Sequence, residues 1–321
     1  MTDRAFRDIL DSPRELVFPK SAALPDGAPS LGKAIEAVLR QARLDRFQKA
    51  SLIRSLWSSV VLPESLAGEV VAAYAQMGGP DLPVALRSSS REEDAEVAAR
   101  AGEFDTFLFI RGEQLILQYL LRTWSGLWSD RALHTREMLG TTTSFAGGGV
   151  IVQQIVNSRV SGVLQTINVA RNDFQEIVIN AGWGLGEGVV SGTVAADQVT
   201  VTKEGDLEKG PLRFSYVTAD KRDHVVFNKR AGLGTMRCEA PYHKRLRPTL
   251  EYAELCELVA VAARLESSYG YPLDIEFALE GSRLWILQAR PVPASNALLQ
   301  ETLRYHPLIH TGESVQAIRG R

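Results

Sequence analysis

The sequence is poor in cysteine and histidine and has little net charge of either sign. Its 321 residues include 2 cysteines and 5 histidines, and the formal net charge is −2. Cys238 and Cys256 lack C-x-x-C spacing, so we expect two free thiols in a reducing cytoplasm. The histidines form no ligand-spaced cluster, which argues against a metal site held by cysteine and histidine. A charge this close to zero gives no support to nucleic-acid binding.

Long apolar runs, targeting signals and common phosphate-binding loops are also missing. No run approaches the ~18 to 20 apolar residues that cross a bilayer. The opening MTDRAFRDIL lacks the apolar core of a secretory signal, so we expect a cytoplasmic protein. No G-x-x-x-x-G-K-[ST] loop occurs in the chain. With 45% hydrophobic and 23% charged residues, the composition is that of a globular protein of one large or two modest domains.

Helical periodicity dominates the first part of the chain. Apolar residues recur at three- and four-residue intervals in 31–44 and 63–77, which predicts helices. Short strands are expected at 84–88 and 104–110. Residues 113–139 form either one long amphipathic helix or two helices broken near Gly126.

From about residue 150 the pattern is typical of strands, and it ends in a helix and a hairpin. The polar, basic tract 203–249 carries no element assignment, and an amphipathic helix is expected at 249–270. The expected strands lie at 150–156, 161–169, 174–183 and 197–205, followed by a closing hairpin at 272–292.

This closing hairpin carries the most informative polar pattern. Alternation places Asp274 and Glu276 on one face of the first strand, and Gln288 and Arg290 share a face of the second. A two-residue loop at 280–281 would send Gln288 to the opposite face, whereas a three-residue loop would gather all of these groups. Carboxylates beside a carboxamide suit Mg²⁺, with a phosphate completing its shell. The alternative is a sheet with one solvated face.

Two further segments allow a functional and a structural interpretation. The alternating glycines of NAGWGLGEGVVSG, at 180–192, permit close approach either to a ligand or between packed elements. In VALRSSSREEDAEVAARAGEF, at 84–104, Arg87 suits bidentate pairing with phosphate, and the backbone near Gly102 suits covering phosphates. An ordinary polar loop is the alternative for the second segment.

Taken together, the segments resemble the nucleotide-binding domain of the phosphoenolpyruvate synthase and pyruvate phosphate dikinase family. That family has patterns like VRSSATAEDxxxxSFAGQxxTxLN, QxMVxxxxSGVxFT, GLGExVVxGxVxPD and DIEW…LYxxQxRP. The matching segments here are LRSSSREEDAEVAARAGEFDTFLF, QQIVNSRVSGVLQT, GLGEGVVSGTVAAD and DIEF…LWILQARP, in the same order. The resemblance spans about residues 84–292.

The resemblance implies an α+β, ATP-grasp-like fold of two subdomains with the nucleotide between them. It places an N-terminal α/β subdomain with a phosphate-covering loop at 1–140. An ATP-grasp subdomain with the metal and phosphate hairpin follows at 141–293, and a tail or linker at 294–321.

The resemblance also assigns site residues. Catalytic roles fall to Arg87, Glu276, Gln288 and Arg290, and Mg²⁺ ligation to Glu276, Gln288 and Asp274. The expected ATP contacts are Lys20, Arg87, Ala101, Gly102, Thr106, Gln153, Gln154, Ile155 and Val156. Two segments depart from the family pattern. Phe18 and Pro19 replace glycines before Lys20, and Arg100 and Glu103 stand where Phe and Gln are usual.

The implied activity is an ATP- and Mg²⁺-dependent phosphotransfer of the dikinase type. ATP would give AMP and phosphate, and a histidine on a separate partner subunit or domain would carry the phosphoryl group to a small acceptor such as pyruvate or a phenol. The chain would then be the ATP-binding subunit of a split enzyme, such as phenylphosphate synthase, or a truncated chain. A non-catalytic nucleotide-binding module is the main alternative, and an independent ligase or kinase is a third.

Overall fold

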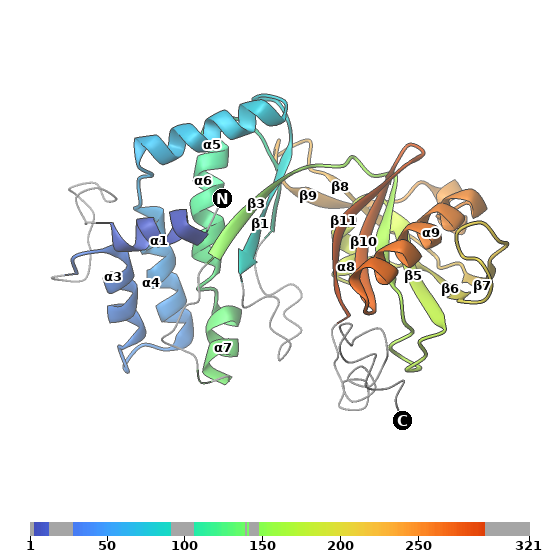
Figure 1. The fold of residues 1–321 in the computed structure, drawn as a ribbon. Helices are drawn as coiled ribbons and strands as arrows, with labels where there is room; N and C mark the ends of the chain where they lie inside the picture. Colours follow the sequence, from blue (N-terminus) through green and yellow to red (C-terminus); the bar gives the residue numbers. More distant parts are fainter. Residues whose placement is uncertain (1–2, 13–27, 91–105, 139, 141–147, 293–321) are drawn as a thin grey trace. The chain divides into compact units, whose positions relative to one another are not determined.

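Helices and antiparallel sheets alternate along the chain (Figure 1). The computed structural model describes residues 3–12, 28–90, 106–138, 140 and 148–292. The α+β class is therefore confirmed, whereas the ATP-grasp-like architecture stays a prediction. Lys20, Ala101, Gly102 and the expected tail lie outside the described residues. No helix in the described ranges is long and apolar enough to cross a membrane.

The chain divides into two units. Unit 1 comprises Met1–Ile155 with Asn228–Gly234, and unit 2 comprises Val156–Phe227 with Thr235–Arg321. This division falls later than the boundary expected at 140. The reason is that β3 (Gly148–Gln154) pairs along its whole length with β1 (Val84–Ser90), which belongs to unit 1.

Unit 1 packs its helices against a three-stranded sheet of order β2-β1-β3, in which β2 is Thr106–Ile110. The predicted stretch at 113–139 is two helices, with the break directly after Gly126. The helices are α1 (Asp3–Asp11), α3 (Leu31–Leu39), α4 (Arg46–Ser58), α5 (Glu64–Met77), α6 (Glu113–Gly126) and α7 (Asp130–Met138).

The core of unit 1 is centred on an aromatic cluster. Phe6, Trp57, Trp124 and Trp128 are buried, and the ring centroids of neighbouring pairs lie between 5.6 and 6.0 Å apart. Rings at this spacing contribute beyond their buried area. The Trp124 indole N–H also donates to the Gly148 carbonyl at 3.2 Å, so this cluster holds α6 against β3.

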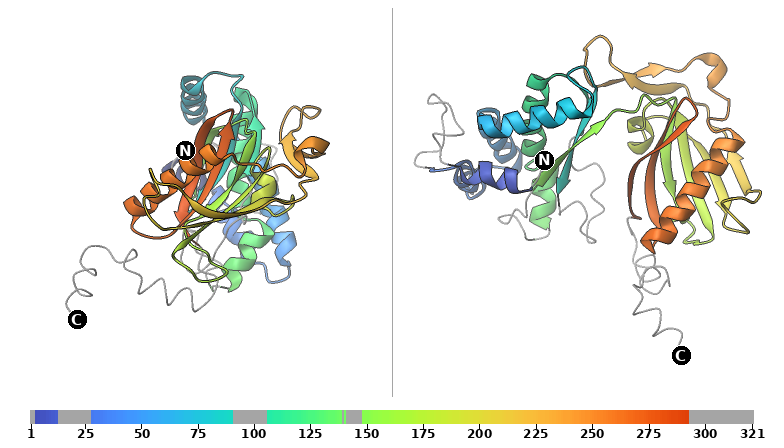
Figure 2. Two further views of the ribbon diagram at one scale, coloured as in Figure 1. Left: turned by 90° about the vertical axis from the view of Figure 1, so that its right-hand side faces the viewer. Right: turned by 45° about the horizontal axis from the view of Figure 1, so that its top comes forward.

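Unit 2 is built on a six-stranded antiparallel sheet of order β11-β10-β4-β5-β6-β7 (Figure 2). Its strands are β4 (Val160–Gln165), β5 (Glu176–Trp183), β6 (Asp197–Thr202), β7 (Arg213–Val217), β10 (Leu273–Glu280) and β11 (Arg283–Pro291). The helices are α8 (Glu187–Val190) and α9 (Tyr252–Tyr269), with a short 3-10 turn, η1, at Tyr242–Lys244.

The two faces of this sheet differ in character. One face and the apolar side of α9 form a continuous core, which includes Ile179, Ile275, Phe277, Leu258 and Val259 at 1% exposure or less. The other face carries Glu276 on β10, Asn180 on β5 and Gln198 on β6 in one row across the sheet, with Val163 of β4 between Glu276 and Asn180. The alternation therefore gives the sheet one buried apolar face and one polar face.

The polar tract 203–249 contains elements that its sequence did not reveal. It forms β7, the strands β8 (Asp223–Phe227) and β9 (Thr235–Glu239), and η1. These strands bury few side chains, so they lack the apolar alternation that marks a half-buried strand. The segment between β8 and β9 belongs to unit 1, where the Gly234 N–H donates to the Leu108 carbonyl at 2.9 Å.

A buried ion pair fixes this tract to the first residue of β6. Lys221 and Asp197 are both fully buried and hydrogen-bonded to each other. Asp197 also accepts from the Tyr216 hydroxyl at 3.0 Å and from the backbone and hydroxyl of Thr249 at 2.8 and 2.9 Å. Burial raises the pKa of the Tyr216 hydroxyl, which therefore remains a donor.

Replacing the lysine of this pair should destabilise the chain strongly. Lys221→Met leaves the Asp197 carboxylate buried without its counter-charge, which costs about 3 to 5 kcal/mol of unfolding free energy. Arg213→Met, which breaks the exposed pair with Glu204, should cost less than about 1 kcal/mol. Urea unfolding of the two variants measures the difference, and equal losses would contradict a structural role for the buried pair.

Candidate functional site

The closing hairpin brings its polar residues together through a β-bulge. The turn is a two-residue loop at 281–282, one position later than the predicted two-residue loop, since Glu280 pairs with Arg283. An extra residue on β11, Leu287, then shifts the register between Glu276 and Phe277. The two-residue length was therefore predicted correctly but one position too early, and the gathering of polar groups expected from the three-residue loop occurs through the bulge instead. Two residues of the bulged strand oppose one of its partner, which restores the alternation.

Beyond the bulge, the predicted residues oppose each other in pairs. Glu276 lies directly opposite Gln288, and Asp274 lies directly opposite Arg290. Directly opposed residues share one face of an antiparallel sheet, so all of these side chains lie on the polar face. The expected cluster of carboxylates, carboxamide and guanidinium is present.

Asp274 is the most buried member of this cluster. Its exposure is 6%, and its Oδ2 accepts from the Nε and Nη2 of Arg290 at 3.1 and 2.8 Å. Its Oδ1 is buried and has no hydrogen-bond partner among the described residues. An unsatisfied carboxylate oxygen in this setting costs free energy until a cation or a donor reaches it.

These residues fit a magnesium ion that brings its own phosphate oxygens. Across the described ranges, no group of three or more His, Cys, Asp and Glu side chains is arranged to hold a metal by itself. Mg²⁺ does not require such a cage, because it is commonly bound through one or two carboxylates and substrate phosphates. Glu276, Gln288 and the unsatisfied Asp274 Oδ1 supply oxygen ligands of this kind.

Unit 1 brings a second group of predicted residues onto one face of its sheet. Arg87 on β1 lies opposite Thr106 on β2 and opposite Ile151 on β3. Gln153 lies opposite Ala85 and so shares this face, two positions from Arg87. The other face, with Leu86 and Val150, packs into the helical core. Arg87, Thr106 and Gln153 therefore occupy the face turned away from the core.

The remaining predicted contacts are less uniform. Gln154 pairs with Val84, which puts it on the opposite face from Gln153. Ile155 ends unit 1, and its N–H donates to the Pro83 carbonyl at 3.0 Å, while Val156 begins unit 2. The resemblance names 153–156 together as ATP contacts, whereas the strand pairing places Gln153 and Gln154 on opposite faces.

The glycine-rich segment favours the packing interpretation. Gly184 has a φ of +80°, and a Cβ there would lie 2.3 Å from the Val225 carbonyl oxygen. A Cβ on Gly188 would lie 2.7 Å from a Val225 methyl group. These glycines therefore let the turn around α8 approach β8 closely, a position that larger residues would prevent.

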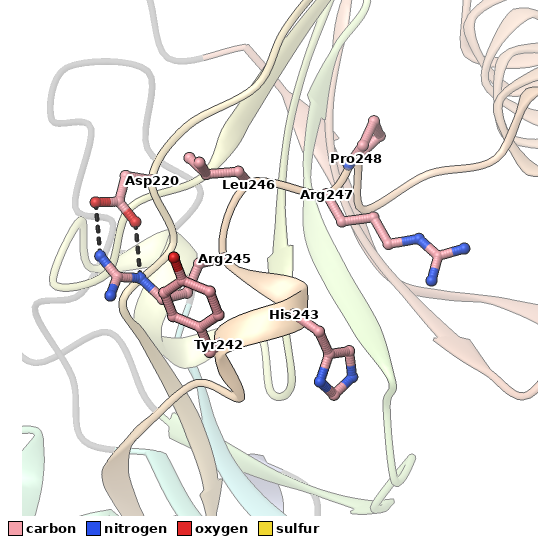
Figure 3. Close-up of a pocket in the computed structure, with 7 residues that line it drawn as sticks. All are labelled: Asp220, Tyr242, His243, Arg245, Leu246, Arg247 and Pro248. Carbon is pink, nitrogen blue, oxygen red and sulfur yellow. Dashed lines mark hydrogen bonds and ion pairs between the residues drawn. The ribbon is translucent and has the colours of Figure 1, made fainter.

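Unit 2 also contains a pocket at a different place, beside η1 (Figure 3). It has a volume of about 470 Å³ and is lined by Asp220, Tyr242, His243, Arg245, Leu246, Arg247 and Pro248. The Asp220 carboxylate accepts from the Arg245 guanidinium at 2.9 and 2.8 Å and from Arg222 at 2.8 Å. None of the residues predicted for catalysis or ATP binding lines this pocket.

The Asp220 carboxyl should titrate unusually low. Hydrogen bonds from Arg245 and then Arg222 lower its pKa from 3.8 to about 2. Its contribution to stability is therefore complete above pH 3.8 and is lost as the pH falls through about 2. A carbon-13 NMR titration of the Asp220 carboxyl measures this. Arg245→Gln should raise the midpoint more than Arg222→Gln, and a midpoint near 3.8 in the unaltered chain would refute the pairing.

Comparison with known proteins identifies the family. The pyruvate phosphate dikinase, AMP/ATP-binding domain family matches residues 27–303. This range contains both the three-stranded sheet that carries Arg87 and the hairpin that carries Glu276 and Gln288. The chain belongs to this family, as the four sequence motifs predicted.

Named relatives support the same family and show that this chain matches only part of their length. A probable phosphoenolpyruvate synthase of Methanocaldococcus jannaschii is 34% identical over 75% of this chain and 20% of the relative. Phosphoenolpyruvate synthase of Pyrococcus furiosus is 34% identical over 76% of this chain and 31% of the relative. Rifampicin phosphotransferase of a Streptomyces species is 32% identical over 83% of this chain and 30% of the relative. The chain thus spans about a fifth to a third of these relatives.

Proposed function

We propose that this chain binds Mg²⁺-ATP and supplies a phosphoryl group in a dikinase-type reaction. The ATP-binding family is shown by the sequence match, and relatives carry the names of phosphotransferases. The observation that carries the proposal is the bulged hairpin, which places Glu276 opposite Gln288 beside the unsatisfied Asp274 oxygen.

The proposed roles follow from charge and geometry. Glu276, Gln288 and Asp274 would hold Mg²⁺, which neutralises charge on the phosphates when it is bound. Arg290 keeps the Asp274 carboxylate oriented through its two hydrogen bonds. Arg87 would pair with phosphate oxygens, as a guanidinium does in bidentate geometry. Phosphoryl transfer depends mainly on positioning and charge neutralisation, so these groups would not need to attack the phosphate themselves, and the nucleophile would come from the acceptor.

The acceptor side of the reaction is proposed to lie outside this chain. The matched relatives are three to five times longer than the aligned region, so they contain further domains. We propose that a histidine on a partner domain or subunit takes the phosphoryl group and passes it to a small acceptor. One relative is named for phosphoenolpyruvate and another for rifampicin, which supports a shared ATP-binding part combined with varied acceptor parts.

Mg²⁺-dependent ATP binding should require Glu276. Glu276→Gln keeps the side chain's shape and removes its charge, so it should weaken binding of a non-hydrolysable ATP analogue at least about tenfold. Isothermal titration calorimetry with Mg²⁺ measures this, and Glu257→Gln on the exposed side of α9 is the matched control. Equal affinity in all three proteins would refute the metal assignment.

Turnover should give AMP and should depend on the histidine-bearing partner. ATP incubated with the chain and that partner is expected to yield AMP and phosphate, and Arg87→Ala should slow this by about a hundredfold or more. Chromatography of the nucleotide products is the measurement. ADP produced by the chain alone would show an independent kinase instead, and ATP binding without any turnover would favour a non-catalytic module.

A further inference from the structure

Gln165 is the polar neighbour of Asp274 on the side away from Arg290. It ends β4, and it lies directly opposite Asp274 in the pairing of β4 with β10. Glu276, by contrast, has the apolar Val163 as its neighbour on β4. The sheet thus places a carboxamide beside one carboxylate of the cluster and an aliphatic side chain beside the other.

The relative position of Gln165 and Asp274 is firmly held. The Thr166 N–H donates to the Leu273 carbonyl at 2.9 Å, and the Leu273 N–H donates to the Thr166 hydroxyl at 2.8 Å. The same hydroxyl donates to Glu266 at 3.0 Å, and Glu266 is paired with Lys203 at 2.7 Å. Thr166 is fully buried. These bonds clamp the residue next to Gln165 against the residue next to Asp274.

The Asp274 carboxylate needs a partner on this side. Arg290 occupies Oδ2 only, and the buried Oδ1 has no hydrogen-bond partner in the described part of the chain. A carboxylate oxygen has two lone-pair sites, so Oδ1 can accept one hydrogen bond and still face a cation. Directly opposed residues have Cβ atoms about 4.5 to 5.5 Å apart, which a glutamine side chain spans by rotation alone.

We infer that Gln165 is a positioning residue of the metal and phosphate site, whose carboxamide N–H donates to Asp274 Oδ1 when Mg²⁺-nucleotide binds. This inference rests on the proposed function. With Arg290 on one oxygen and Gln165 on the other, the carboxylate plane would be fixed, and the second Oδ1 lone pair would remain available to the cation.

Mn²⁺ binding in the presence of a non-hydrolysable ATP analogue tests this inference. The spectroscopic signal of free Mn²⁺ reports affinity without any turnover. Gln165→Met keeps the length of the side chain and should weaken Mn²⁺ binding about tenfold, as loss of an outer hydrogen bond to a metal ligand does. Gln198→Leu is the control, because Gln198 lies on the same sheet face two strands farther from Asp274. It should bind Mn²⁺ like the unaltered chain.

A double variant separates positioning from general structural damage. Because Gln165 acts through Asp274, adding Gln165→Met to Asp274→Asn should weaken binding no further. If Asp274→Asn weakens Mn²⁺ binding and Gln165→Met leaves it within twofold, the role of Gln165 is overturned and the proposed site stands. If neither change affects Mn²⁺ binding, both the role of Gln165 and the proposed metal site are overturned. Additive losses in the double variant would also overturn the positioning role, and Gln165→Leu repeats the test if the methionine variant fails to fold.

Discussion

The hairpin of β10 and β11 has one residue more on β11 than on β10, and this extra residue decides which side chains meet. Without the bulge at Leu287, the alternation of β11 would carry Gln288 and Arg290 into the apolar face, against the core under α9. With it, both strands present their polar residues on the same side. The proposed metal and phosphate site therefore depends on a local irregularity in a regular sheet, and the rest of unit 2 holds that irregularity in place.

Buried polar links supply much of that support. Glu266 of α9 is bonded to Thr166, directly after β4, and to Lys203, directly after β6, so α9 is fixed to the ends of both strands. The buried Lys221–Asp197 pair fixes the segment before β8 to the first residue of β6. Buried ion pairs contribute little net stability compared with apolar packing, but an arrangement that separates the two partners leaves a buried charge without compensation and is disfavoured. A site that must hold oxygen ligands at fixed positions gains from this kind of rigidity.

The sequence predicted the elements that bury one apolar face, and it predicted the family. The strand alternation around Asp274 and Glu276 and the helix at α9 have strong periodicity, so their patterns were readable. The bulge at Leu287 could not be predicted from the sequence, because the position of the turn and the register depend on how the two strands pair in space. β7, β8 and β9 were missed since their side chains are mostly exposed. Gln165 carried no signal in its own motif, and its interest comes only from lying opposite Asp274.

The most direct test of the central claim is a crystal structure of the chain with Mg²⁺ and a non-hydrolysable ATP analogue. We predict a metal ion coordinated by Glu276 and Gln288 on the polar face of the six-stranded sheet, with Asp274 Oδ1 directed toward it and phosphate oxygens completing its shell. A nucleotide bound elsewhere, such as in the pocket beside Arg245, with no metal at Glu276 and Gln288, would contradict it.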